Sequence, residues 1–307
     1  MSKRINLGVS TSAVLLTTFA VIGCTRAVTV TDASRSTLPQ PSHERIEEPS
    51  DLSADFEVPI FSTPVEVFLP HREVTEANEA GLLVHLHGAA FIPVAAAQRS
   101  DTPFVVAVVN LGAGSSRYEK PFAERGAFER LVTSVSDSLE KRIGRRLSSR
   151  ELIITSFSAG YGAVRAILRD PSNVEQLDRL LLLDGLHEDY DPDGAPVPGG
   201  NRIDTTGMQP FLAFARRAVS GEKAMLVTHS AIVPGTYVST TETADHLIMR
   251  LGLRRAAVRR NGPAGMQQTS EASAGRFRVM GFPGDAAPDH LDHIHGLVEF
   301  LQMLEEL

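Results

Sequence analysis

A serine, an aspartate and a histidine in this chain each follow a stretch that is expected to be a strand. Ser158 follows the apolar run at residues 152–154, Asp184 follows four consecutive leucines, and His290 follows the expected strand at 276–282. A hydroxyl, a carboxylate and an imidazole together carry nucleophilic acyl transfer, since the imidazole takes the hydroxyl proton and the carboxylate fixes the imidazole tautomer. We therefore expect Ser158 as nucleophile, Asp184 as acid and His290 as base.

The turn around Ser158 is built from small residues. In Ser-Phe-Ser-Ala-Gly, from Ser156 to Gly160, the residues two before and two after Ser158 are both small. This matches the G-x-S-x-G nucleophile elbow with serine in place of the first glycine, a turn so sharp that larger side chains there would collide. Such a turn directs the first amides of the following helix at an oxyanion, so we expect Ala159 to supply one donor. Taken alone, the pentapeptide also fits an ordinary joint between a strand and a helix.

A second stretch of small residues follows an earlier strand. His85-Leu-His87-Gly-Ala-Ala runs directly out of the strand expected at 82–86 and is similar to the HGGG-type oxyanion loop. Small side chains there let backbone amides approach a developing oxyanion. We expect the second donor to be the amide of Ala89 or Ala90, and His87 to orient the loop by hydrogen bonding.

The acid has one competitor, Glu242. Asp184 ends an apolar strand, where a charge is unfavourable unless it is paired. Glu242 lies beyond the following strand, but Ser-Thr-Thr-Glu from Ser239 to Glu242 has the spacing of a capping box, in which the glutamate reaches back to the helix start. Asp184 is therefore the expected acid, with Glu242 as the alternate.

The base also has a competitor, His293. In a helix over 288–307 the apolar residues from Ile294 to Leu304 form one inward stripe, with His290 at its centre and His293 on its flank, while His295 points away. We therefore expect His290 to reach Ser158. His293 and His295 are expected to be solvated or locally hydrogen-bonded, and His293 is the alternate base.

Apolar runs and amphipathic stretches alternate along the chain after residue 60. Strands are expected at 65–69, 82–86, 104–111, 152–154, 180–183, 224–228 and 276–282, and helices at 120–145, from 160 onward, and at 209–219, 241–251 and 288–307. This order predicts an α/β fold with a mostly parallel sheet covered by helices on both faces. A Pro/Gly/Asp-rich loop at 188–206 is expected on the active-site side. Arg254, Arg255, Arg259 and Arg260 are expected on a solvated face near a helix end.

The order of the three site residues along the chain is serine, then aspartate, then histidine, each after a strand. Over residues 60–307 this pattern resembles the α/β-hydrolase superfamily of serine esterases and lipases. Two features depart from the usual pattern: Ser156 opens the elbow, and Asp184 follows the strand next to the nucleophile strand, one strand earlier than in most members. The resemblance implies hydrolysis of a small-molecule ester through an acyl-enzyme, without a cofactor or a metal. The sequence does not specify the acyl group, the oligomeric state, or whether the bond that is cleaved is an ester or an amide.

The first residues have the pattern of an export signal. Lys3 and Arg4 precede an apolar segment, and Val-Ile-Gly-Cys ending at Cys24 resembles the lipobox of bacterial lipoproteins. The resemblance implies a signal peptide at 1–23, lipidation of Cys24 and a membrane anchor in the bacterial cell envelope. The polar, Ser/Pro/Thr-rich residues 24–55 are expected to be a flexible tether before a folded domain at 56–307.

Composition excludes some classes of function and leaves two rivals. The formal charge of −7 argues against a nucleic-acid partner, and a single cysteine excludes an intrachain disulfide framework or a Cys-based zinc site. One rival is a metal-binding protein that uses His290 and His293 with the neighbouring Asp289 and Asp292, and with His85 and His87 nearby, although this would leave the elbow unexplained. The other is a non-catalytic envelope lipoprotein that uses a hydrolase-like scaffold for binding.

Overall fold

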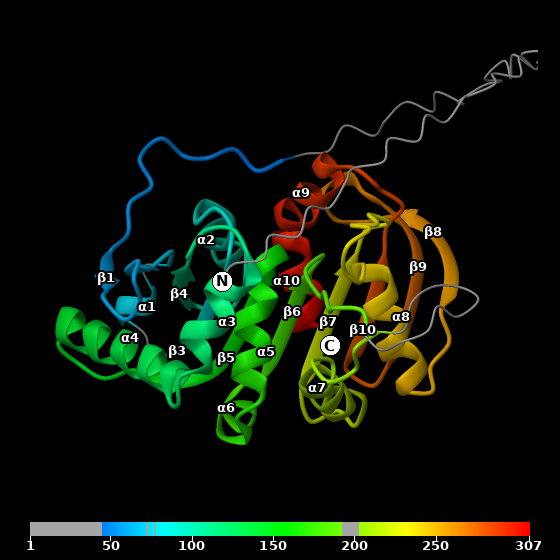
Figure 1. The fold of residues 1–307 in the computed structure, drawn as a ribbon. Helices are drawn as coiled ribbons and strands as arrows, with labels where there is room; N and C mark the ends of the chain where they lie inside the picture. Colours follow the sequence, from blue (N-terminus) through cyan, green and yellow to red (C-terminus); the bar gives the residue numbers. More distant parts are fainter. Residues whose placement is uncertain (1–44, 72, 77, 192–202) are drawn as a thin grey trace, which may run out of the picture. The chain divides into compact units, whose positions relative to one another are not determined.

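The computed structural model describes residues 45–71, 73–76, 78–191 and 203–307. Within these ranges ten strands form one sheet in the order β1-β2-β4-β3-β5-β6-β7-β10-β9-β8 (Figure 1). The six central strands, from β4 to β10, are parallel, and antiparallel strands flank them on both sides. The expected α/β fold with a mostly parallel sheet is therefore confirmed. The strands are β1 (Phe56–Val58), β2 (Val65–Phe68), β3 (Glu79–Leu86), β4 (Phe104–Val109), β5 (Ser148–Phe157), β6 (Arg179–Leu183), β7 (Ala224–His229), β8 (Ala256–Asn261), β9 (Gln267–Ala274) and β10 (Phe277–Gly281).

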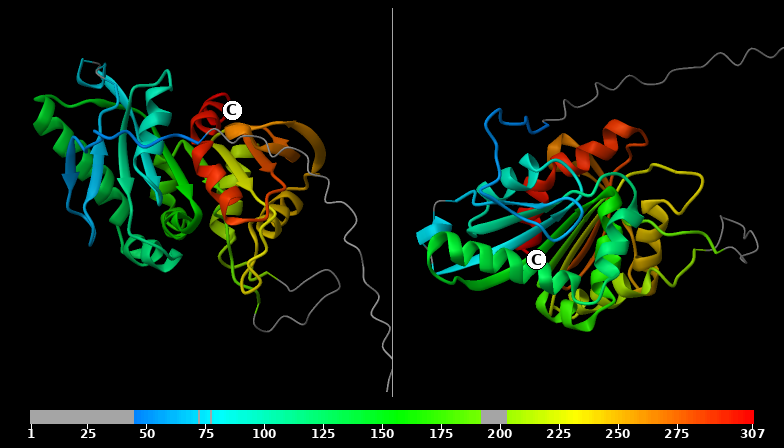
Figure 2. Two further views of the ribbon diagram at one scale, coloured as in Figure 1. Left: turned by 90° about the horizontal axis from the view of Figure 1, so that it is seen from above. Right: turned by 60° about the vertical axis from the view of Figure 1, so that its left-hand side comes forward.

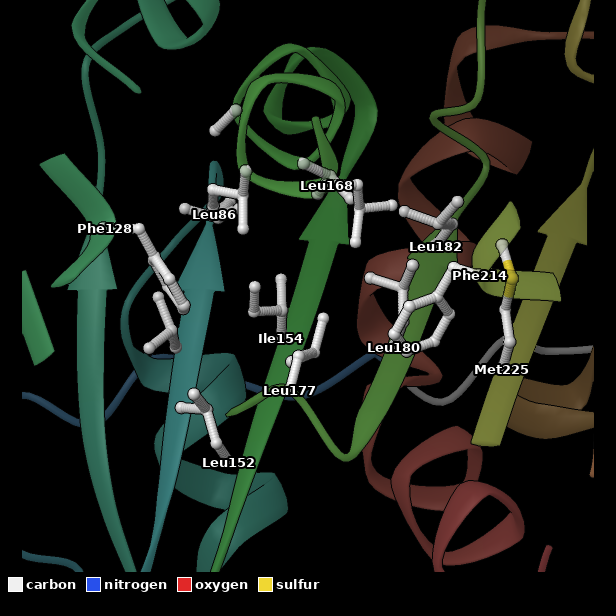
Figure 3. Packing of buried hydrophobic residues seen from close by; sticks show 14 of the residues in the cluster. Leu86, Phe128, Leu152, Ile154, Leu168, Leu177, Leu180, Leu182, Phe214 and Met225 are labelled. Carbon is white, nitrogen blue, oxygen red and sulfur yellow. The ribbon is translucent and has the colours of Figure 1, made fainter. Parts of the chain in front are cut away.

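The central strands are apolar on both sides because helices cover both faces of the sheet. Along β6, Leu180 and Leu182 belong to one core, whereas Leu181 and Leu183 belong to the other. Figure 3 shows the first of these cores, where Leu182 lies beside residues from the neighbouring strands and from the helices above them. This period of two is what an extended chain imposes on its side chains.

Figure 2 shows helices on both sides of the sheet. One core contains buried residues of α3 (Ser115–Ala123), α4 (Ala127–Ile143), α5 (Tyr161–Leu168), α7 (Gln209–Val219) and α8 (Thr240–Arg250). The other contains buried residues of α2 (Phe91–Gln98), α9 (Ala287–His295) and α10 (Leu297–Glu305). The short helices α1 (Glu73–Glu76) and α6 (Pro171–Gln176) complete the set in the described ranges.

Two of the expected helices are divided. The helix expected at 120–145 is α3 followed by α4, with Gly126 between them at a φ of 69°, a conformation that favours glycine. The helix expected at 288–307 ends at His295 and restarts at Leu297, with Gly296 at the break. A side chain at Gly296 would meet the ring of Phe300 and Pro263, each at 2.9 Å.

The hairpin formed by β8 and β9 was not expected, and it corrects the interpretation of the arginines near it. Arg259 and Arg260 lie in β8, in the sheet and not at a helix end. Arg255 is not simply solvated, because its guanidinium pairs with Asp245 and bonds His229 Nε2 at 2.7 Å. Most side chains of β8 are exposed, so the strand lacks the apolar signal on which the prediction depended.

The expected signal peptide, Cys24 and tether residues 24–44 lie outside the described residues. Residues 45–55 differ from a free tether, because Arg45 pairs with Asp292 and Leu52 packs against the second core. Within the described residues, contacts of the domain therefore extend before the expected boundary at 56, as far as Arg45. In the part of the chain that the structure describes, none of the helices has the length and apolar character needed to span a bilayer.

Candidate active site

Ser158 lies in a strained turn at the carboxyl end of β5. The strand ends at Phe157, and residues Ser158–Gly160 form one turn of 3-10 helix before α5 begins. Ser158 has a φ of 46°, in the left-handed region, which costs a non-glycine residue about 1–3 kcal/mol. A strained, half-buried serine between a strand and a helix is the local geometry expected of a nucleophile elbow.

The neighbours of Ser158 must be small. A side chain at Gly160 would overlap the carbonyl oxygen of Leu86 and lie 2.7 Å from Ser156 Oγ. A side chain at Gly185 would lie 2.7 Å from the amide nitrogen of Ser158. The packing therefore explains the small residues of the elbow motif and also the glycine directly after Asp184.

Asp184 and His290 are brought together from positions 106 residues apart. His290 Nδ1 lies 2.7 Å from Asp184 Oδ2. Asp184 Oδ1 accepts hydrogen bonds from the Ser230 amide at 2.8 Å and the Thr240 hydroxyl at 2.6 Å. The Asp184 carboxyl group is only 2% exposed, so these three donors supply the polar partners that burial would otherwise remove.

Burial alone would raise the pKa of Asp184. The imidazoles of His293 and His290 and the hydrogen bond from Thr240 outweigh burial and hold that pKa well below its usual range. Burial also lowers the pKa of His293, so this ring is neutral near pH 7. We therefore attribute the ionised state of Asp184 chiefly to its hydrogen bonds.

Ser158, Asp184 and His290 line one pocket of about 340 Å³. Among the described residues, Ser158 Oγ has no hydrogen-bond partner, whereas His290 bonds Asp184. This fits an enzyme without substrate, because a nucleophile and its base are often loosely spaced before substrate binds. Sequence reasoning missed several other residues that line this pocket, because they converge only in the folded chain. They are His187, Ser230, Ile232, Pro234, Tyr237, Thr240, Asp285 and Ala287.

The predicted oxyanion loop lies beside the elbow. Strands β3 and β5 are parallel, and Leu86 is in register with Ser156, so the chain leaves both strands at the same edge. Ala90 directly precedes α2, and Ala159 lies in the first helical turn after β5. The first amides of a helix have no partner within it, so the amides of Ala90 and Ala159 have the local setting of oxyanion donors, and Ala89 directly precedes Ala90 in the same loop.

His87 holds this loop in place. Its Nδ1 lies 2.8 Å from the Tyr118 hydroxyl, and its φ of 71° turns the chain sharply after β3. Asn110 donates to the carbonyl oxygen of Gly88 at 3.1 Å. Both contacts hold the loop that carries Ala89 and Ala90, and the one made by His87 agrees with its expected orienting role.

No protein-family model matches the sequence, and no curated protein matches it either. Among solved structures, the chain is similar to the enterobactin esterase from Shigella flexneri, determined in the presence of enterobactin. The TM-score is 0.51 and the sequence identity 13%, over 87% of this chain and 63% of that chain. The chain has the α/β-hydrolase fold.

Two further solved structures are similar to this chain. One is a ferulic acid esterase, with a TM-score of 0.47 and 14% identity over 78% of this chain and 91% of that chain. The other is a lipase/esterase from Lactobacillus plantarum, with a TM-score of 0.40 and 11% identity over 82% of this chain and 96% of that chain. The chain spans less than two thirds of the enterobactin esterase, at 63% of its length.

The fold does not bring His293 to the pocket. His293 is 1% exposed, and its Nδ1 lies 2.8 Å from the Thr228 hydroxyl, which is 65 residues away in the sequence. The expectation of a solvated or locally bonded His293 is therefore wrong. His295 is half-buried and accepts a hydrogen bond from the Ile46 amide at 3.1 Å, which also differs from a free side chain. Both contacts come from elements far away in the sequence, which helical phase alone does not reveal.

Glu242 has the structural role that its spacing predicted. Ser239 caps α8, its hydroxyl accepts from the Glu242 amide, and the Glu242 carboxylate accepts from the Ser239 amide at 2.9 Å. The carboxylate also accepts from the Tyr190 hydroxyl at 3.2 Å. Glu242 therefore stabilises the start of α8 and does not line the pocket that contains Ser158.

The acidic residues near His290 are engaged in other contacts. Asp289 accepts from the Ala286 amide at 2.9 Å, and Asp292 pairs with Arg45 at 2.9 Å. Among the described residues, no group of three or more histidine, cysteine, aspartate or glutamate side chains is arranged to hold a metal ion.

Proposed function

We propose that this chain is a serine hydrolase that cleaves a carboxylic ester through an acyl-enzyme. The observation that carries the proposal is the 2.7 Å contact between His290 and a buried Asp184, in a pocket that both share with Ser158. The solved structures with this fold that are named as esterases support the same class of reaction. An ester is proposed before an amide because its leaving group departs more easily.

In the proposed reaction Ser158 Oγ attacks the ester carbonyl carbon while His290 Nε2 takes its proton. Asp184 accepts from His290 Nδ1–H, which keeps Nε2 free as the base and stabilises the imidazolium that forms. The amide of Ala159 and that of Ala89 or Ala90 bind the oxyanion of the tetrahedral intermediate. When the intermediate collapses, the alcohol leaves with the proton from His290.

The same residues would release the acid product. Water attacks the carbonyl carbon of the acyl group bound to Ser158 Oγ and gives a proton to His290. The same two amides bind the second oxyanion. Ser158 Oγ then takes the proton back from His290 as the carboxylic acid departs. None of these steps requires a metal or a cofactor.

We also propose that lipidation of Cys24 holds the domain at a membrane of the bacterial cell envelope. The similarity of the residues before Cys24 to a lipobox supports this proposal, as does the position of the single cysteine of the chain. Several acyl chains on one residue would give stable anchoring, whereas a single chain binds only marginally.

Turnover of p-nitrophenyl esters of increasing acyl length tests the activity. The full chain should hydrolyse some of them, and Ser158→Ala should lose that turnover by a factor on the order of 10⁴ or more while staying folded. A folded wild-type chain without turnover on any of the esters, or an equally active Ser158→Ala, would favour a binding scaffold with this fold.

A further inference from the structure

The segment before β1 contacts the helix that carries His290. We call residues 45–54 the N-terminal strap; Figure 1 shows it in blue, leading toward α9. Arg45 Nε donates to Asp292 Oδ1 at 2.9 Å, and Arg45 Nη2 donates to the Pro288 carbonyl oxygen at 2.9 Å. The Ile46 amide donates to His295 Nδ1 at 3.1 Å. The strap therefore holds α9 at three positions, near its first turn, its middle and its end.

Helix α9 depends on such outside contacts. It has only nine residues, and isolated helices shorter than about 12 residues are marginal in water. Its N-cap residue is Ala286, which has no side-chain oxygen to accept from the first amides. Gly296 separates α9 from α10, so the two helices do not support one another as a single rod.

The contact of Arg45 with α9 is stronger than an ordinary surface ion pair. The Asp292 side chain is 2% exposed, whereas that of Arg45 is 40% exposed. A charged donor on a buried carboxylate makes a stronger hydrogen bond than one in water. Ile46, Leu52 and Ala54 also pack against the core that contains Ile294. Charge and apolar contact thus fix the strap to the same side of the molecule.

We propose that the N-terminal strap is a positioning element, which holds α9 so that His290 keeps its contact with Asp184 and its reach to Ser158. The inference rests on the proposed function, since it concerns the base of that reaction. His290 lies between the attachment points at Pro288 and Asp292, so a shift of α9 moves the imidazole. The carboxylate stays in place, because Ser230 and Thr240 hold Asp184 independently of the strap.

The test compares Arg45→Ala with Arg142→Ala in the full chain. Arg142 is a matched control because it pairs with Asp55, just after the strap, at 3.3 Å, and α9 is not involved. A displacement of a reacting group by 1 Å can lower the reaction rate about a hundredfold. Arg45→Ala should therefore lower kcat by about five- to tenfold, with KM nearly unchanged. Arg45→Lys should recover part of the loss. Equal kcat values in Arg45→Ala, Arg142→Ala and wild type would overturn the proposal.

Amide hydrogen exchange separates this proposal from the proposed function. The amides of α9 should exchange at least severalfold faster in Arg45→Ala than in wild type, with α5 unchanged, and the same difference should appear in a Ser158→Ala background. If the wild type proves inactive but the exchange difference is present, the proposed function fails and the strap remains a positioning element of α9. If the wild type is active and α9 exchange is unchanged, the positioning proposal fails alone.

Discussion

Replacing Asp184 with asparagine should reverse the tautomer of His290 without unfolding the chain. Two donors, the Ser230 amide and the Thr240 hydroxyl, surround Oδ1, so the single oxygen of asparagine should stay on that side. Its NH₂ group then faces His290 Nδ1 at the position where Oδ2 lies 2.7 Å away. An NH₂ group can only donate, so Nδ1 must accept, and the proton moves to Nε2, which can no longer take the proton of Ser158.

The expected loss of kcat is about 10⁴-fold, which corresponds to about 5.4 kcal/mol of activation free energy. The stability loss should be smaller, about 1–2 kcal/mol at neutral pH, because the amide keeps the hydrogen bonds and loses only their charge. The pKa of Asp184 is lowered in the folded chain, so its ionised form stabilises the fold above the unfolded pKa, and this contribution is lost as pH falls through the folded value. Wild type and Asp184→Asn should therefore converge in stability toward acid pH.

Glu242→Gln is the matched comparison, because Glu242 follows the strand after which most members of the α/β-hydrolase superfamily carry the acid. It should weaken the capping box and cost on the order of 1 kcal/mol of unfolding free energy with turnover nearly unchanged. Esterase kinetics and urea unfolding of both variants decide the matter. An active Asp184→Asn with an inactive Glu242→Gln would refute this assignment and make Glu242 the acid.

Three further predictions concern the histidines and the anchor. His290→Ala should lower kcat by a factor on the order of 10⁴ or more, whereas His293→Ala should keep turnover and lose about 1–3 kcal/mol of unfolding free energy; the reverse pattern would identify His293 as the base. Burial lowers the pKa of His229 from 6.5 to about 4 in the folded chain. As pH falls, His229 is therefore protonated first in the unfolded chain, and the free energy of unfolding should fall by up to about 3 kcal/mol between pH 6.5 and 4. Urea unfolding should show a smaller fall in His229→Gln, and an equal fall would count against this cause. Cys24→Ser should move the protein out of the membrane fraction with unchanged specific activity, and release of the wild type by salt without detergent would argue against lipidation.

The parts of the fold that the sequence predicted are those where burial dictates residue type. The strand at 180–183 is four leucines because both of its faces are covered, and a small residue is required at Gly160 by contact with the end of β3. The phase of α9 also placed His290 on the side that faces Asp184, and its neighbour in the stripe, Ile294, is buried in the core.

Predictions from the sequence were wrong or incomplete for segments made of polar residues and for contacts between segments that are far apart in the chain. Strand β8 exposes most of its residues, so it lacks the apolar alternation of a half-buried strand. Polar composition suggested a free tether through residue 55, yet Arg45 reaches a carboxylate 247 positions away. Thr240 lies inside a capping motif, which conceals that its hydroxyl bonds Asp184. Hydrogen bonds of this kind depend on the tertiary fold and leave no local pattern.

Labelling with a fluorophosphonate probe tests the central claim most directly, because the probe forms a covalent bond only with an activated serine hydroxyl. The full chain should take up one adduct, peptide mass mapping should locate it at Ser158, and Ser158→Ala should remain unlabelled. His290→Ala should be labelled far more slowly, since the strained turn alone does not deprotonate the hydroxyl. A folded wild-type chain that takes up no probe, or an adduct on another serine, would contradict the account.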